Sequence, residues 1–223
     1  MTKAVIFDMD GVLIDSEPLH FESDKLTFRE FGLEVTDSVL NNFVGVSNSE
    51  MWEKLRIDFD IAAPVQEILE KQAVHKMRLF SGDALKPVDG VGELLTFLHD
   101  NDVATGLASS SPVDFIMHIL AGLHITEYFK AVVSGEEVDK GKPEPDIFLK
   151  AAELLGIAPE DCIVIEDSGH GIAAAKKAGM RSIAYRNPNS GSQDLSASDY
   201  VVDSMAEAWS ILDRKSTRLN SSH

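Results

Sequence analysis

Short apolar runs that end abruptly in polar residues recur along this chain, and they constrain its fold more than any other feature. The first run, Ala4 to Phe7, stops at Asp8. Apolar runs of this length between polar residues are typical of buried strands. Similar runs cover residues 103–108, 131–133, 162–165, 182–185 and 200–202, and helical patterns separate most of them, at 91–99, 112–121, 145–155 and 170–178. Strands that alternate with helices predict a Rossmann-like α/β fold, in which helices flank a parallel sheet.

The residues that end three of these runs can carry chemistry. Asp8 follows the first run, Ser109 follows the second, and Glu166 and Asp167 follow the run at 162–165. Ligands of open α/β sheets bind at the carboxyl ends of the strands. We therefore expect these side chains to line one crevice.

Asp8 has a second carboxylate close behind it. Asp10 lies two residues further on, and Gly11 follows it. Residues two apart on an extended backbone point the same way, so the two carboxylates can converge, and glycine allows a sharp turn after them. Buried carboxylates are costly to desolvate unless a cation with a preference for oxygen ligands offsets their charge. The pair predicts a cation site, although acidic residues that merely begin a loop are the simpler alternative.

Residues 15–83 interrupt the alternation of strands and helices. Helical patterns cover 18–31 and 64–80, and a capping box at Ser47–Glu50 opens another helix. We expect an inserted, all-helical cap at 15–83, with hinges near 15–18 and 81–88. The catalytic core would then comprise 1–14 and 84–213. The segment 214–223 has no apolar periodicity and no acidic residue, so we expect an appended, disordered tail.

Charge and composition exclude several classes of partner. The formal net charge is −17, which should repel nucleic acid and anionic membranes. No apolar run approaches the length of a membrane span, no signal peptide is evident, and the single cysteine, Cys162, rules out an internal disulfide. These features predict a cytoplasmic protein without a membrane or nucleic-acid partner. They do not fix the oligomeric state, and a monomer is compatible with them.

An anionic ligand would require positive charge within the site itself. Lys142 precedes Pro143 in a loop that leads into a helix. A residue before proline is held extended, which can aim Lys142 back toward the strand ends. Lys140 competes for this role, and its alternative is a solvated loop charge. The spacing favours Lys142 slightly.

Four motifs at these positions form an ordered set along residues 3–185. They are Asp8-x-Asp10, Ser109 after a strand, Lys142-Pro143 and Glu166-Asp167. The set resembles the haloacid dehalogenase (HAD) superfamily of phosphotransferases. The helical insertion after the first motif resembles the branch that contains beta-phosphoglucomutases and sugar-phosphate phosphatases. Asp10 separates the chain from the dehalogenases, which lack a second aspartate and need no metal.

The resemblance implies a Mg²⁺-dependent phosphatase that hydrolyses a small phosphorylated metabolite, such as a sugar phosphate, through an aspartyl-phosphate. Asp8 would be the nucleophile, and Asp10 would act as general acid and then as general base. Mg²⁺ would be held by the Asp8 carboxylate, the Asp10 backbone carbonyl and Asp167, with Glu166 assisting directly or through water.

The resemblance also assigns the groups that bind the phosphoryl oxygens. Ser109, Ser110 and backbone amides at the start of the 112–121 helix would donate hydrogen bonds to them. Lys142 would offset the negative charge of Asp8 and of the phosphoryl group. His20 and Asn48, in the expected cap, are candidates for substrate contact.

A phosphosugar mutase of the beta-phosphoglucomutase type is the alternative function. The mutases of this branch carry an arginine after Gly-Val-Ser for a second phosphate, whereas here Asn48 follows Gly45-Val46-Ser47. A neutral amide cannot supply the charged, bidentate grip of arginine. His20 favours the mutase instead, since the mutases have a histidine at the matching position. The balance favours a phosphatase.

A non-enzymatic reading comes from phospho-acceptor signalling domains, which also carry an aspartate at a strand end. Those domains are much shorter, have no cap, and place their acidic pair before the acceptor strand. Here Glu166 and Asp167 come near the end of the chain. A non-catalytic member of the HAD superfamily is a second possibility, but none of the four motifs is missing.

Overall fold

The computed structural model describes residues 2–43, 46–82 and 85–217, and for 214–217 it describes the backbone alone. The chain divides into two compact units. One unit comprises Met1–Asp15 and Lys86–His223, and the other comprises Ser16–Leu85. Each boundary lies within a residue or two of the expected one. Part of the second expected hinge, 83–84, lies outside the described residues.

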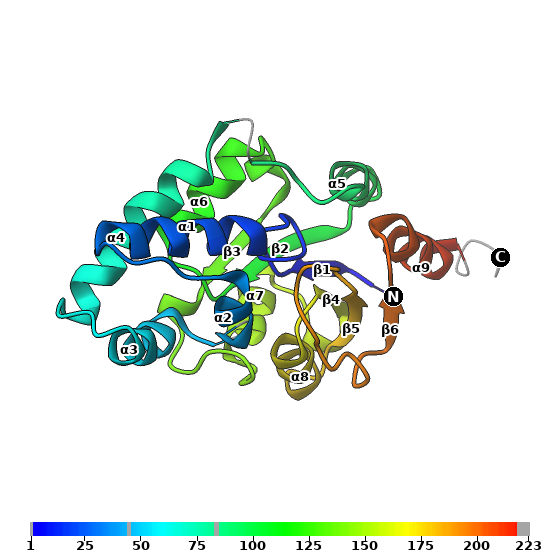
Figure 1. The fold of residues 1–223 in the computed structure, drawn as a ribbon. Helices are drawn as coiled ribbons and strands as arrows, with labels where there is room; N and C mark the ends of the chain where they lie inside the picture. Colours follow the sequence, from blue (N-terminus) through cyan, green and yellow to red (C-terminus); the bar gives the residue numbers. More distant parts are fainter. Residues whose placement is uncertain (1, 44–45, 83–84, 218–223) are drawn as a thin grey trace. The chain divides into compact units, whose positions relative to one another are not determined.

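The larger unit is built on a six-stranded sheet in the order β3-β2-β1-β4-β5-β6, and every neighbouring pair is parallel. Its strands are β1 (Ala4–Phe7), β2 (Ala104–Ser109), β3 (Ala131–Ser134), β4 (Cys162–Glu166), β5 (Arg181–Tyr185) and β6 (Tyr200–Val202). This confirms the expected α/β fold with a parallel sheet (Figure 1). Strands β2, β3 and β4 each run one residue past the end of their apolar pattern, because Ser109, Ser134 and Glu166 still pair in the sheet.

The order of the strands creates a switch point beside β1. The chain passes from β1 to β2 and β3 on one side, and then returns to β4, β5 and β6 on the other. Ligand crevices of open α/β sheets form where the strand order reverses in this way, outside the carboxyl ends of the strands. The segments that follow β1 and β4 therefore occupy the position where a site is expected.

Helices cover both faces of the sheet, as the alternation predicts. They are α5 (Val91–Asp100), α6 (Val113–Gly122), α7 (Asp146–Leu155), α8 (Gly169–Lys177) and α9 (Met205–Thr217), with single 3-10 turns at Thr126–Tyr128, Gly135–Glu137 and Pro159–Asp161. Helices α7 and α8 cover one face, where Ala4 and Ile6 of β1 enter an apolar core with Phe148. Helices α5, α6 and α9 lie on the opposite face (Figure 1), toward which Val5 and Phe7 alternate.

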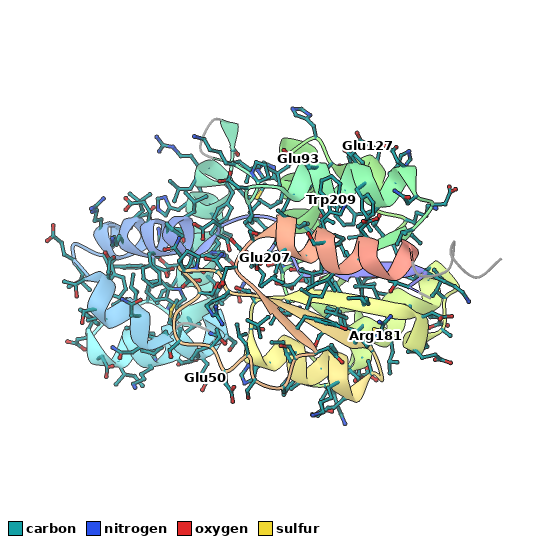
Figure 2. The ribbon with its side chains drawn as sticks, turned by 90° about the vertical axis from the view of Figure 1, so that its right-hand side faces the viewer. Glu50, Glu93, Glu127, Arg181, Glu207 and Trp209 are labelled. Carbon is teal, nitrogen blue, oxygen red and sulfur yellow. The ribbon has the colours of Figure 1, made fainter. Side chains whose placement is uncertain are left out.

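Helix α9 packs beside α5 at the end of the chain, and the sequence patterns did not predict it. Its Trp209 ring lies 5.1 Å from the ring of Phe97 on α5, and Figure 2 shows Trp209 on the side of α9 nearest α5. The helix continues through Thr217. The expected tail at 214–223 therefore begins inside a helix, and its remainder, 218–223, lies outside the described residues.

The smaller unit contains only helices among its described residues. They are α1 (Glu17–Glu30), α2 (Asp37–Leu40), a 3-10 turn (Asn41–Phe43), α3 (Asn48–Asp58) and α4 (Val65–Leu79). Ser47 caps α3 by accepting a hydrogen bond from the Glu50 amide, which is one of the two hydrogen bonds of the expected capping box. The core of this unit contains aromatic contacts among aliphatic side chains: the Phe28 ring lies 5.0 Å from the ring of Trp52 and 4.9 Å from that of Phe59.

None of the helices in the described ranges combines the length and the apolar character that crossing a bilayer requires.

Candidate active site

Adjacent strands bring three acidic side chains together beside the switch point. In the register of β1 and β4, Phe7 lies opposite Ile165, so Asp8 and Glu166 follow at the same level. Asp8, Glu166 and Asp167 are 7%, 1% and 7% exposed. Each offers an oxygen within 4.8 Å of the others. The strand ends thus gather carboxylates from positions some 160 residues apart, as the sequence analysis expected.

The ammonium group of Lys142 lies among these carboxylates. It donates hydrogen bonds to Asp8 Oδ1 at 2.5 Å and to Glu166 Oε1 at 2.7 Å, and a third to the Ala108 carbonyl at 3.1 Å. Its competitor Lys140 is exposed. The Lys142–Pro143 peptide bond is cis. Of the two lysines that the sequence offered, the structure therefore brings Lys142 to the strand ends.

Negative charge outweighs positive charge in this cluster, and the pKa values of its groups are shifted. Burial raises the pKa of Asp8 to about 7; Lys142 opposes this rise, while the charges of Glu166 and Asp10 add to it. Burial also raises the pKa of Asp167, and the negative charges of Glu166 and Asp8 raise it further. Burial alone would lower the pKa of Lys142, but Asp8 and Glu166 outweigh burial and raise it.

This donor set fits a small divalent cation. All the charged ligands are carboxylate oxygens, which Mg²⁺ prefers, and they converge from three residues within a few ångströms. A single buried ammonium faces three buried carboxylates. A cation there would offset both the burial and the added repulsion that raise the pKa of the two aspartates. The buried cluster of Asp8, Glu166 and Asp167 could therefore hold a divalent cation.

Glu166 is held more tightly than the other two carboxylates. Lys142 occupies its Oε1, while Oε2 accepts hydrogen bonds from the Asp167 amide and from the amide and hydroxyl of Ser168. A Cβ at Gly171 would lie only 1.7 Å from Glu166 Oε1, so glycine makes room for this side chain. Because both oxygens of Glu166 already accept hydrogen bonds, this side chain is better suited to holding Lys142 and Asp167 in place than to binding a metal ion directly.

Asp10 lies in the turn that leaves β1, and its side chain is half-buried. Gly11, at φ +75°, donates from its amide to the Ile14 carbonyl at 2.8 Å and so closes the turn. The hydroxyl of Ser111 donates to Asp10 Oδ2 at 3.1 Å. The Ser111 hydrogen bond thus joins the Asp10 side chain to the segment that follows β2.

Ser111 contacts Asp10, a role that the sequence patterns did not predict. Helix α6 begins at Val113, one residue after the start of the 112–121 pattern, and Pro112 is at its N-cap position. The hydroxyl of Ser111 donates to Asp10. The run of serines at 109–111 was the available signal, but it could not show which of them reaches Asp10.

Ser109 and Ser110 differ in exposure. Ser109 is the last residue of β2 and is completely buried, and its Oγ accepts a hydrogen bond from the Ser111 amide at 3.1 Å. Ser110 is exposed, and its backbone lies close to Gly135, where a Cβ would approach the Ser110 Cα and carbonyl oxygen to 3.1 Å. Ser109 thus ends the strand next to β1, and Ser110 begins the segment that follows that strand.

The two candidates from the expected cap belong to the helical unit. His20 is on α1, with its ring 5.0 Å from the ring of Phe80. Asn48 is the exposed first residue of α3. The cluster at the strand ends, which is defined within the larger unit, does not include them.

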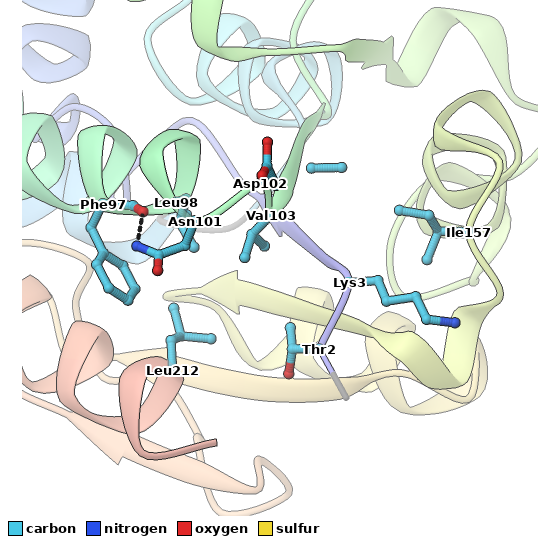
Figure 3. A pocket seen from close by; sticks show the side chains of 10 residues that line it. Thr2, Lys3, Phe97, Leu98, Asn101, Asp102, Val103, Ile157 and Leu212 are labelled. Atoms are coloured by element: carbon cyan, nitrogen blue, oxygen red, sulfur yellow. Dashed lines mark hydrogen bonds between the residues drawn. The ribbon is translucent and has the colours of Figure 1, made fainter. Parts of the chain in front are cut away.

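A cavity of about 340 Å³ lies elsewhere in the larger unit. Figure 3 shows Thr2 and Lys3, just before β1, and Asn101 to Val103, just before β2, along its wall. It therefore lies at the amino ends of these strands, the edge of the sheet opposite Asp8.

Comparison with known proteins identifies the family. Residues 5–185 match the model of the haloacid dehalogenase-like hydrolases. This range contains Asp8, Lys142, Glu166 and Asp167. The chain therefore belongs to the haloacid dehalogenase-like hydrolase family, which confirms the resemblance found in its motifs.

Individual relatives include both a phosphatase and a mutase. The chain is 36% identical to the phosphorylated carbohydrates phosphatase of Thermotoga maritima over 181 residues, or 81% of this chain and 83% of the relative. It is 35% identical to the beta-phosphoglucomutase of Bacillus subtilis over 220 residues, or 93% and 95%. A solved structure from Thermotoga maritima assigned as a beta-phosphoglucomutase superposes with a TM-score of 0.82, at 32% identity over 95% of this chain and 99% of that one. The phosphatase relative supports the expected enzyme class, a phosphoric monoester hydrolase.

Proposed function

We propose that this protein is a Mg²⁺-dependent phosphatase that hydrolyses a small sugar phosphate through an aspartyl-phosphate at Asp8. The observation that carries the proposal is the convergence of Asp8, Glu166 and Asp167 around the Lys142 ammonium at the switch point of the sheet. Phosphoryl transfer depends mainly on positioning and on neutralising charge, and this cluster is equipped for both. A cytoplasmic location stays a prediction from composition.

In the proposed reaction Asp8 acts as the nucleophile and Asp10 transfers protons. A carboxylate oxygen of Asp8 attacks phosphorus, and the bond from phosphorus to the sugar oxygen breaks while Asp10 gives that oxygen a proton. Water then attacks the phosphorus of the aspartyl-phosphate and passes a proton to Asp10, so that inorganic phosphate leaves and Asp8 is restored. The hydrogen bond from Ser111 would orient the Asp10 carboxyl, while Lys142 is bonded to Asp8.

The remaining residues neutralise and orient the phosphoryl group. Lys142 offsets negative charge beside Asp8, and Glu166 fixes the direction of its ammonium. Ser109, Ser110 and the amides before α6 would donate to phosphoryl oxygens. Asp8, Asp167 and the Asp10 carbonyl would hold Mg²⁺, with Glu166 assisting; the bound ion would supply positive charge to the attacking and departing oxygens.

Asn48 favours hydrolysis over a mutase reaction. A mutase must hold a second phosphate, and Asn48 stands where the mutases of this branch place an arginine after Gly-Val-Ser. A neutral amide binds phosphate less strongly than a guanidinium group does. The mutase remains the second candidate, because His20 matches that class and the Bacillus subtilis mutase is almost as similar as the phosphatase.

A substrate panel tests the proposal. The protein is incubated with Mg²⁺ and a set of hexose and pentose monophosphates, and free phosphate is measured. We expect phosphate release from one or more of them, and loss of that release when EDTA removes Mg²⁺. Release that is unaffected by EDTA, or absent across the panel, would contradict the proposal.

The same preparation separates the two candidate functions. Beta-glucose 1-phosphate is supplied with a trace of the 1,6-bisphosphate, and glucose 6-phosphate and free phosphate are followed together. A phosphatase releases phosphate at least as fast as it forms glucose 6-phosphate. Glucose 6-phosphate forming far faster than free phosphate would establish the mutase instead.

A further inference from the structure

The loop between β5 and β6 makes side-chain hydrogen bonds to the segments that follow both β1 and β4. Strand β4 lies between β1 and β5 in the sheet, so this loop must pass over the end of β4 to reach the segment after β1. Its contacts come from residues 187–193, here called the 187–193 loop. None of the four motifs of the site includes it.

Two asparagines fasten the loop to the segment after β1. Asn187 is 6% exposed, and its side-chain amide donates to the Gly11 carbonyl at 3.0 Å and to Asp15 Oδ1 at 3.3 Å. Asn189 donates to Asp15 Oδ2 at 2.6 Å. Asn187 Oδ1 also accepts from the Asn189 amide at 2.8 Å. An amide side chain can donate and accept at once, which an ionised aspartate cannot do.

A serine and a glutamine fasten the same loop to the segment after β4. Ser190 Oγ donates a hydrogen bond to Asp167 Oδ2. Gln193 Oε1 accepts from the amide of Gly169, the first residue of α8, at 3.2 Å, and its amide group donates to the Ser190 carbonyl at 3.0 Å. The carboxylate of Asp167 is therefore bonded to a loop that is hydrogen-bonded to the segments after both β1 and β4.

The three segments meet at Gly11. A Cβ on this residue would lie 1.9 Å from Asp167 Oδ2 and 2.9 Å from Ser190 Oγ. The absence of a side chain at Gly11 therefore creates the space in which the Asp167 carboxylate and the Ser190 hydroxyl meet. The open space at Gly11 thus allows the hydrogen bond between these two side chains.

We propose that Ser190 is a positioning residue for Asp167, holding one of its carboxylate oxygens so that the group is oriented to bind the divalent cation, and that Asn187 anchors the loop that carries Ser190. The inference rests on the proposed function, since that function requires Asp167 as a cation ligand. Hydrogen bonds to metal ligands fix their orientation, and their loss weakens metal affinity by about 10- to 100-fold.

The test is Mg²⁺ binding by the full-length protein, measured by titration calorimetry without substrate. We expect Ser190→Ala to weaken the Kd for Mg²⁺ by about 10-fold. Ser190→Thr keeps the hydroxyl and should retain an affinity close to that of the wild type. Ser192→Ala is the matched control, because Ser192 is an exposed serine of the same loop, and it should bind Mg²⁺ as the wild type does.

Thermal unfolding in EDTA accompanies each titration, because a purely structural role for Ser190 would change the unfolding temperature but not the Kd for Mg²⁺. An unchanged Kd in Ser190→Ala, or an equal weakening in Ser190→Thr, would overturn the inference. So would a wild-type protein that binds no Mg²⁺. Calorimetry decides the inference even if the substrate panel shows no hydrolysis, which would overturn only the proposed function.

Discussion

Lys142 determines the charge balance of the cluster at the strand ends. Its ammonium is the shared hydrogen-bond partner of Asp8 and Glu166, and its side chain is only 7% exposed. Phe148 lies beneath it, with the ring centroid 5.0 Å from Nζ. The contacts of Lys142 with both carboxylates thus fix the place of this positive charge, which we propose meets the phosphoryl group.

The first prediction concerns this lysine. We expect Lys142→Met to lower kcat for phosphate release by about 100-fold or more, the usual cost of removing one group that stabilises transition-state charge. Lys140→Met, in the same loop but exposed, should leave kcat within about twofold of the wild type, since surface substitutions are usually near neutral. Equal losses in the two variants would show that Lys142 has no special role.

Gly11 provides a second prediction at this scale. Gly11 and Gly156 both have positive φ, +75° and +67°, but a Cβ would meet Asp167 only at Gly11; at Gly156 it would have open space. We expect Gly156→Ala to cost about 1 kcal/mol of unfolding free energy, the penalty of a left-handed alanine, with kinetics unchanged.

Gly11→Ala should carry the same cost in unfolding free energy. It should also lose most of its Mg²⁺ affinity and activity, because the carboxylate of Asp167 must move. Urea unfolding and phosphate release, measured on both variants, check the pair. Wild-type activity in Gly11→Ala would contradict the geometry described for the meeting of the three segments.

At the scale of elements, the apolar runs and helical patterns predict all six strands and most of the helices of the larger unit. Their ends are less predictable, because Ser109 and Glu166 are polar and still pair in the sheet. Helix α9 was missed although Met205, Ala208 and Leu212 are buried at helical spacing. The 187–193 loop was missed for another reason: Asn, Pro, Ser and Gly are ordinary turn residues, and their partners lie far away in the sequence.

The helical unit yields a prediction about pH. Asp24 on α1 is buried and accepts a hydrogen bond from Gln72 on α4. Burial raises its pKa above the ordinary value of 3.8, although the Gln72 hydrogen bond and the charge of Lys76 oppose the rise. A group whose pKa is raised by folding costs no stability below its unfolded pKa, and it costs progressively more as pH rises through its folded pKa.

Asp24→Asn keeps the acceptor oxygen and removes the buried charge. We therefore expect its unfolding temperature to exceed that of the wild type at pH 8, with a smaller difference at pH 4. Asp58→Asn, at an exposed position on α3, should show no such pH-dependent gain. A destabilised Asp24→Asn at pH 8 would mean that the negative charge is needed there.

At the scale of the whole molecule, the site depends on the order of the strands. Asp8 lies near the beginning of the sequence and Glu166 near its end, yet β1 and β4 are neighbours in the sheet. Sequence patterns predict that both residues end strands, but the pairing of those strands is a property of the assembled fold. The ordered motifs resemble those of a known family, and that resemblance implied that Asp8, Lys142, Glu166 and Asp167 come together. No motif includes the contacts of Ser111 and Ser190, so the sequence did not predict them.

The net charge of −17 also acts at this scale. A protein this acidic repels an anionic substrate over long distances, so capture depends on positive charge placed within the site. Lys142 and a bound cation are the proposed sources of that charge. Residues Ser16–Leu85 form a separate helical unit, so the charged cluster lies entirely within the larger unit. His20 and Asn48, which we propose take part in substrate selection, belong to the helical unit.

Phosphate release by Asp8→Asn from the best substrate of the panel, with Mg²⁺ saturating, tests the proposed role of Asp8 as nucleophile most directly. Asparagine preserves the shape of the side chain, so thermal unfolding in EDTA should show a folded protein. We expect kcat to fall by at least about three orders of magnitude, as for other removed nucleophiles. Phosphate release at a rate near that of the wild type would contradict this role.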